Sequence, residues 1–93
     1  GKDKEAIAEY QKATELNPKY VEAWFDLGVA HYNDENYAAA EAAYQKVVQL
    51  KNDYWIAYAN LGDTYRQMNE PGKAEGAYRI AISRIKDDAE LYS

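Results

Sequence analysis

Residues that could carry out chemistry are few in this chain. It has one histidine, His31, and no cysteine, which excludes a disulfide, a thiolate metal site and a cysteine nucleophile. No nucleophile-elbow pattern surrounds Ser83, and Gly72 and Gly76 do not form a phosphate-binding loop. With 16 acidic residues among 93, neighbouring carboxylates arise by chance and indicate no acid–base pair. We therefore predict no catalysis, no metal site and no cofactor.

The charge balance excludes two classes of partner. The chain carries 11 basic and 16 acidic residues, a net charge of −5. Nucleic acids and anionic membranes both attract positively charged surfaces, so neither is an expected partner. No apolar run approaches the roughly 18 residues of a membrane span. The sequence does not fix the compartment, although a cytoplasmic location is favoured.

An internal repeat organises the sequence. Shifting the chain by 34 positions aligns it with itself without a gap, so that Tyr10 falls on Tyr44 and Tyr44 on Tyr78. Such a period is the signature of a repeat architecture. Further matches are Ala6 with Ala40 and Ala74, Leu27-Gly28 with Leu61-Gly62, Ala23 with Ala57, Tyr20 with Tyr54, and Leu16 with Leu50.

Each period contains two stretches with helical periodicity. One runs from about Lys19 to Tyr32 and the other from about Tyr37 to Gln49, with small and apolar residues at three- and four-residue steps. Asn17-Pro18 and Asn52-Asp53 are predicted to cap the helices that follow them. Within the units, the turn residues Glu35 and Asn69 are expected to adopt a left-handed backbone, which asparagine accepts better than glutamate.

The spacing of these residues resembles the tetratricopeptide repeat. The first complete unit reads Trp24-x2-Leu27-Gly28-x2-His31, then Ala40-x3-Tyr44; the next reads Tyr58-x2-Leu61-Gly62-x2-Tyr65, then Ala74-x3-Tyr78. The resemblance implies an all-α fold, a right-handed superhelical array of antiparallel helix hairpins. His31 stands where the family usually has tyrosine. We expect it to be a neutral packing residue, with a pH-sensitive contact as the alternative.

The repeat phase divides the chain into four segments. Residues 1–20 form the second helix of a truncated repeat, 21–54 and 55–88 are complete repeats, and 89–93 begin a further helix. Because one hairpin cannot bury its apolar face alone, neighbouring units must stack. The small residues Gly28, Gly62, Ala40 and Ala74 allow the close helix contacts, and Tyr10, Tyr44 and Tyr78 fill the space between layers. Gly76, inside a helix, is also a candidate for close backbone approach.

The resemblance implies a concave groove lined by the first helix of each unit. We therefore predict a protein or peptide partner, apolar with some basic residues, because residues 21–54 hold six acids and two bases. Phe25 and Val29 either contact this partner or fill the gap between adjacent first helices. The groove residues are Glu22, Phe25, Asp26, Val29, Tyr32 and Asn33 in one unit, and Ile56, Ala59, Asn60, Asp63, Arg66 and Gln67 in the next.

Two other roles remain open. In the first, the array is a structural module that stacks on its own copies, with self-association through open ends such as the surface around Ala6, Ile7 and Tyr10. In the second, it is a regulatory region of a larger and possibly enzymatic polypeptide. Trp24 and Trp55 are expected to be packing residues, with Trp55 alternatively placed at a rim.

Overall fold

The computed structural model describes residues 2–92, which form five helices and no strand. The predicted all-α fold is therefore confirmed. The helices are α1 (Lys2–Leu16), α2 (Val21–Asn33), α3 (Tyr37–Leu50), α4 (Trp55–Gln67) and α5 (Pro71–Tyr92).

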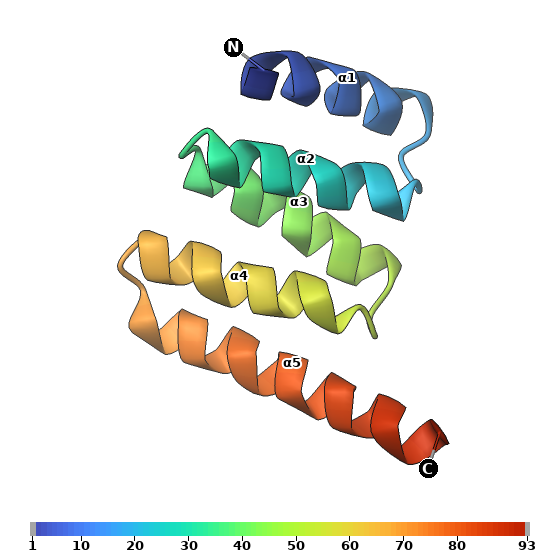
Figure 1. The fold of residues 1–93 in the computed structure, drawn as a ribbon, viewed down its shortest axis with the longest axis vertical. Helices are drawn as coiled ribbons and strands as arrows, with labels where there is room; N and C mark the ends of the chain where they lie inside the picture. The colour runs from blue at the N-terminus through green and yellow to red at the C-terminus, as the bar shows by residue number, and fades with distance from the viewer. Residues whose placement is uncertain (1, 93) are drawn as a thin grey trace.

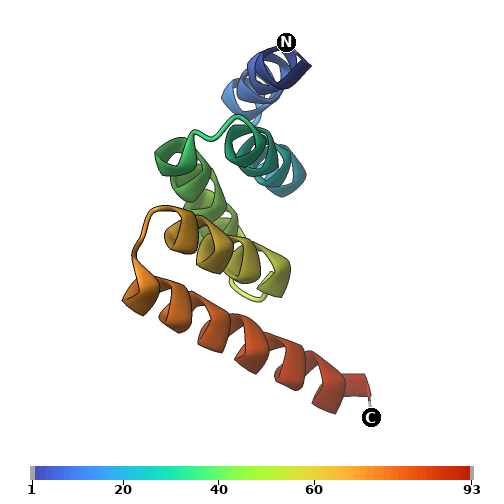
Figure 2. The same cartoon turned by 60° about the vertical axis from the view of Figure 1, so that its left-hand side comes forward.

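Each helix packs against its neighbours in sequence, α1 on α2, α2 on α3, α3 on α4 and α4 on α5. Consecutive helices run in opposite directions, and they follow one another from the N-terminus at one end of the molecule to the C-terminus at the other (Figures 1 and 2). The resulting body measures 42 × 30 × 18 Å. This is the expected array of stacked antiparallel hairpins, in which contacts are local in sequence.

The turns inside the two hairpins confirm the left-handed residues. Glu35 has a φ of 60° and Asn69 a φ of 61°. In each turn the left-handed residue and the one after it donate backbone N–H groups back to the last helical turn; Asn36 bonds to the His31 carbonyl at 2.9 Å and Glu70 to that of Tyr65 at 2.8 Å. This arrangement is the Schellman motif, which satisfies carbonyls at the end of a helix.

The turns between hairpins differ from the prediction. α2 and α4 begin one residue after Tyr20 and Tyr54, and neither helix has a side-chain cap. Pro18 lies in the turn, where its carbonyl accepts a 2.7 Å hydrogen bond from the Trp24 indole N–H. The Asn17 side chain accepts the Lys19 N–H at 3.3 Å and so shapes the turn. The capping prediction was wrong at both turns, because the Asn17 side chain bonds within its own turn and Asn52 Oδ1 accepts a 2.9 Å hydrogen bond from Arg84 of α5.

The expected break before residue 89 is also absent, because α5 continues from Pro71 through Tyr92. One period after Pro18 and Asn52 the chain has Lys86, preceded by Ile85. Neither residue disfavours a helix strongly. The helix therefore continues through the position at which the two earlier units turn.

Contacts between glycine and tyrosine hold each hairpin together. A Cβ atom placed on Gly28 would lie 2.6 Å from Tyr44 Cε1, and one on Gly62 would lie 2.5 Å from Tyr78 Cε1. The predicted close approach at these glycines is thus confirmed, and its partner is the repeated tyrosine. Ala40 and Ala74, also predicted to be small for packing, are 0% and 3% exposed.

Gly76 does not have this role. A Cβ atom added there would meet nothing within 4 Å, and the residue is exposed. The expectation of close backbone approach at this position was therefore wrong, and Gly76 only weakens the helix.

Gly28→Ala is expected to destabilise the fold more than Gly62→Ala. Overpacking costs about 1–3 kcal/mol, against a gain of roughly 1 kcal/mol in helix propensity for alanine over glycine. Tyr44 is only 2% exposed and cannot move aside, whereas Tyr78 is half-buried and can shift. Urea denaturation of both variants and the wild type measures the difference.

Gly76→Ala is the matched control for this experiment. Because the site is open, the substitution should stabilise the protein by about 0.5–1 kcal/mol. If Gly28→Ala stabilised the protein as much as Gly76→Ala does, the proposed role of the glycine–tyrosine contact would be contradicted.

Candidate functional site

The twelve predicted groove residues lie on α2 and α4, the first helices of the two complete units. None of them is fully buried. Six are half-buried, namely Phe25, Val29, Tyr32, Ala59, Asn60 and Asp63, and six are exposed, namely Glu22, Asp26, Asn33, Ile56, Arg66 and Gln67.

Four of these residues meet in one depression, which we call the central cleft. Val29 and Tyr32 come from α2, Asn60 and Asp63 from α4, and Tyr44 of α3 completes the lining. The cleft has a volume of about 140 Å³. The repeat pattern predicts only a packing role for Tyr44. The contact of Tyr44 with Gly28 places the tyrosine ring at the cleft. The repeated glycine and tyrosine are therefore the sequence signal that could have located it there.

Hydrogen bonds join the cleft to the second helices. The Asn60 amide donates to the Tyr44 hydroxyl oxygen at 3.5 Å, and the Tyr78 hydroxyl donates to Asp63 Oδ1. At these two positions the hydroxyls of the repeated tyrosines thus reach polar partners, as those of buried tyrosines usually do. These bonds fix the polar side chains on the α4 side of the cleft.

Burial raises the pKa of the phenol in the central cleft. Desolvation raises the pKa of Tyr44 to about 12, with the nearby Asp63 charge contributing in the same direction. Desolvation and the hydrogen bond to Asp63 likewise raise the pKa of Tyr78, an effect that Arg66 partly opposes. Both phenols therefore stay protonated to a higher pH than a free tyrosine, and the Tyr78 hydroxyl remains a hydrogen-bond donor to Asp63.

Phe25 packs inside the array. Its ring centroid lies 5.8 Å from that of Tyr44 in a tilted arrangement and 5.4 Å from that of Tyr54 in an edge-to-face arrangement. Both geometries are favourable for aromatic pairs. Phe25 therefore links the first unit to the start of the next, which supports the gap-filling interpretation for this residue.

Two other hollows lie beside the central cleft. One, between α1 and α2, includes Ala6, Tyr10 and Asp26, together with Asp3, Val29, Ala30 and Asn33. The other lies at the turn before α4, where Trp55 and Ile56 meet Lys51, Asp53, Tyr54 and Asp88. Trp55 thus lies at a rim, half-buried, whereas Glu22, Arg66 and Gln67 line neither these hollows nor the central cleft.

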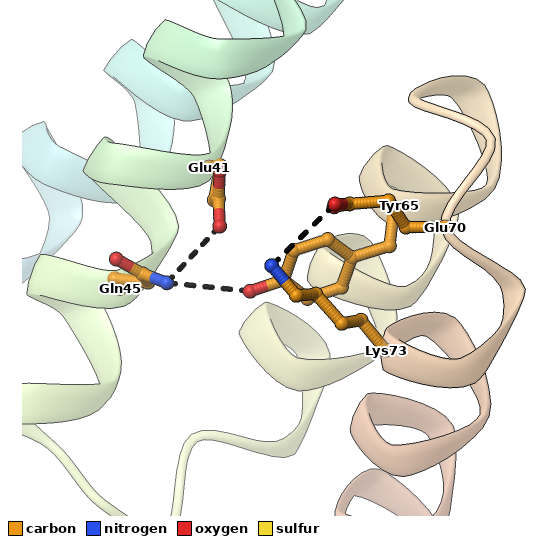
Figure 3. A network of polar contacts seen from close by, with 5 residues as sticks. All are labelled: Glu41, Gln45, Tyr65, Glu70 and Lys73. Carbon is orange, nitrogen blue, oxygen red and sulfur yellow. Dashed lines mark hydrogen bonds and ion pairs between the residues drawn. The ribbon is translucent and has the colours of Figure 1, made fainter.

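A polar network joins the second helices to α4 (Figure 3). The Gln45 amide donates to Glu41 at 3.3 Å and to the Tyr65 hydroxyl at 3.2 Å. Lys73 pairs with Glu70 at 3.5 Å, and its ammonium lies 5.8 Å from the centroid of the Tyr65 ring. The network stabilises the contacts of α4 with α3 and α5.

His31 occupies the position one period before Tyr65, and it is 8% exposed. Its Nδ1 atom is buried without a hydrogen-bond partner among the described residues. Burial lowers the pKa of His31, and the Asp34 charge partly opposes this effect. The histidine is therefore a neutral packing residue near pH 7, and its ionisation is unfavourable in the fold.

Within residues 2–92, no helix has the length and apolarity needed to cross a membrane. The same part of the chain contains no group of three or more histidine, aspartate and glutamate side chains arranged to hold a metal ion.

The geometry defines a helical-repeat protein with a cleft between its first helices. Three family models match it: TPR repeat over residues 1–35, and two Tetratricopeptide repeat models over residues 21–54 and 57–91. Together they cover almost the whole sequence. The chain belongs to the tetratricopeptide repeat family. A comparison with curated proteins found no significant match.

Three solved structures of MamA share the fold. Two MamA crystal structures are 24% and 25% identical to this chain, cover 97% and 95% of it, and superpose with TM-scores of 0.94 and 0.88. The structure of MamA MSR-1 C2 is 22% identical over 94% of the chain, with a TM-score of 0.91. The chain spans about half the length of these proteins, 53%, 48% and 50% respectively.

Stability is expected to fall as the pH drops from 7.5 through 6.5, in part because of His31. Its pKa in the folded state lies below the unfolded value of 6.5, so the unfolded chain takes up the proton first. The loss ends once the pH is below the folded-state pKa. Urea denaturation at pH 7.5, 6.5 and 5.5 should show a smaller decrease for His31→Gln than for the wild type.

Asp34→Asn provides the control. Removing the charge that favours protonated His31 should lower the histidine pKa further and enlarge the pH-dependent loss. Identical pH dependence in the wild type and His31→Gln would refute a contribution from this histidine.

Proposed function

We propose that the chain is a non-catalytic protein-interaction module whose groove along α2 and α4 binds a segment of a protein partner. The central cleft carries this proposal, because it combines half-buried apolar and polar side chains from two adjacent units. Pockets of mainly apolar lining with a few placed polar groups are typical binding sites. Membership of the tetratricopeptide repeat family supports the same role.

The partner segment combines apolar and basic residues. On α2, the exposed acids Glu22 and Asp26 border the groove, and Asp63 of α4 lies in the cleft. The remaining acids of residues 21–54 lie elsewhere, so the groove holds only part of that unit's negative charge. Complementary charge chiefly raises the rate and selectivity of association.

Selection of 12-residue peptides from a random library on the immobilised chain tests this function. The double variant Glu22→Lys/Asp26→Lys should bind the selected peptides with an association rate lower by roughly tenfold at low salt. Both side chains are exposed, so the fold should be retained, which circular dichroism checks.

Glu9→Lys/Glu15→Lys is the matched control, because it makes the same charge change at exposed positions of α1 that line none of the three hollows. It should leave binding nearly unchanged. The function proposed for the groove fails if no peptide is enriched, or if both double variants bind like the wild type.

One surface favours self-association as a second function. Ile82 of α5 is 64% exposed and lines an open depression of about 450 Å³ with Tyr78 and Ala74, together with Arg66, Pro71, Glu75 and Arg79. One period earlier, the corresponding Val48 and Tyr44 pack into the core. Sedimentation of the wild type and Ile82→Lys over a range of concentrations separates the two functions, since only stacking through α5 would be lost in this variant.

A further inference from the structure

The chemistry of the central cleft indicates which side chain it receives. Val29 and the ring of Tyr32 form the α2 side, the Tyr44 ring lies in the lining, and Asn60 and Asp63 form the α4 side. Apolar and aromatic surface therefore faces a single carboxylate. Among residues 2–92, no basic residue lines the cleft. Arg66 lies outside it and is exposed, and Tyr78 and the Asp63 charge raise its pKa.

Existing hydrogen bonds leave acceptors on the α4 side. Asn60 uses its amide N–H₂ group toward Tyr44, so its carbonyl oxygen can accept from a ligand. Asp63 accepts the Tyr78 hydroxyl at Oδ1, and a carboxylate has acceptor capacity for further donors. Both Asn60 and Asp63 are partly exposed. The cleft thus offers acceptors to a donor that enters from the groove.

We propose that the central cleft binds one cationic side chain, a lysine or an arginine, of the partner segment. Its methylene stem lies against Val29 and Tyr32, and its charged end is held by Asp63 and the Asn60 carbonyl. This inference rests on the proposed function and specifies one contact of the same groove.

An apolar side chain would fit the cleft less well. It would cover the Asp63 carboxylate without replacing the water that solvates it, which is unfavourable. Long basic side chains bury an apolar stem while presenting a charge at the end, and the aromatic rings add attraction for a cation. The cleft volume of about 140 Å³ suits a single side chain rather than a longer segment.

Nuclear magnetic resonance titration of the whole chain with side-chain mimics tests the inference. The probes are n-butylammonium, n-butylguanidinium and, as the uncharged control, 1-butanol. Saturable shifts of the Tyr32 and Asn60 amides are expected with at least one cation. 1-Butanol should bind more weakly by about fivefold, the effect expected for a partly exposed ion pair.

Three variants identify the contact. Asp63→Asn should weaken binding of the cation by about fivefold, whereas Glu9→Gln, which removes the same charge at an exposed position of α1 outside the cleft, should not. Tyr78→Phe removes the hydroxyl bound to Asp63 but keeps the carboxylate, so it should retain binding. If Tyr78→Phe weakens binding as much as Asp63→Asn, Asp63 matters only through its hydrogen bond to Tyr78 and does not contact the cation. The inference is then wrong.

Other results would also overturn the inference. Equal shifts with 1-butanol and the cations would identify an apolar pocket, and an absence of shifts at Tyr32 and Asn60 would show that the cleft binds none of the probes. Peptides selected on the groove but lacking lysine and arginine would refute this contact while leaving the proposed function intact. Failure to select any peptide would instead refute the function.

Discussion

The contact of a tyrosine ring with a helical glycine determines much of this structure. Tyr44 lies on Gly28 and Tyr78 on Gly62, with no space for even a methyl group between them. The contact sets the separation of the two helices in each hairpin. It also directs the tyrosine hydroxyls toward Asn60 and Asp63 on α4. One packing constraint thus builds the hairpin and supplies the base of the cleft.

Features that depend on local sequence could be predicted. The 34-residue period established the hairpins, and the left-handed backbone at Glu35 and Asn69 followed from their position between two helical patterns. Both are decided by residues close together in the chain. The twelve groove residues also fall on the two expected helices, because helical periodicity determines which residues share a face.

Features that depend on competing interactions could not be predicted. Trp24 bonds to the Pro18 carbonyl, which places that proline in a turn instead of at the start of a helix. The free space around Gly76 depends on which residues of other elements face it, and the repeat pattern does not specify them. The central cleft combines side chains from three helices, so its lining follows from packing between units and not from any one motif.

The cleft is assembled largely where the repeats differ. Tyr44 recurs in every period, but Val29 is replaced by Asp63 one period later, and Asp26 by Asn60. Positions that repeat preserve the helix contacts in each unit, so changing them would disturb the scaffold. Positions that vary between repeats lie on the same helices, and changing them alters the surface without disturbing the scaffold. The residues that differ between repeats should therefore determine which partner binds. In this chain they place a carboxylate beside apolar and aromatic side chains.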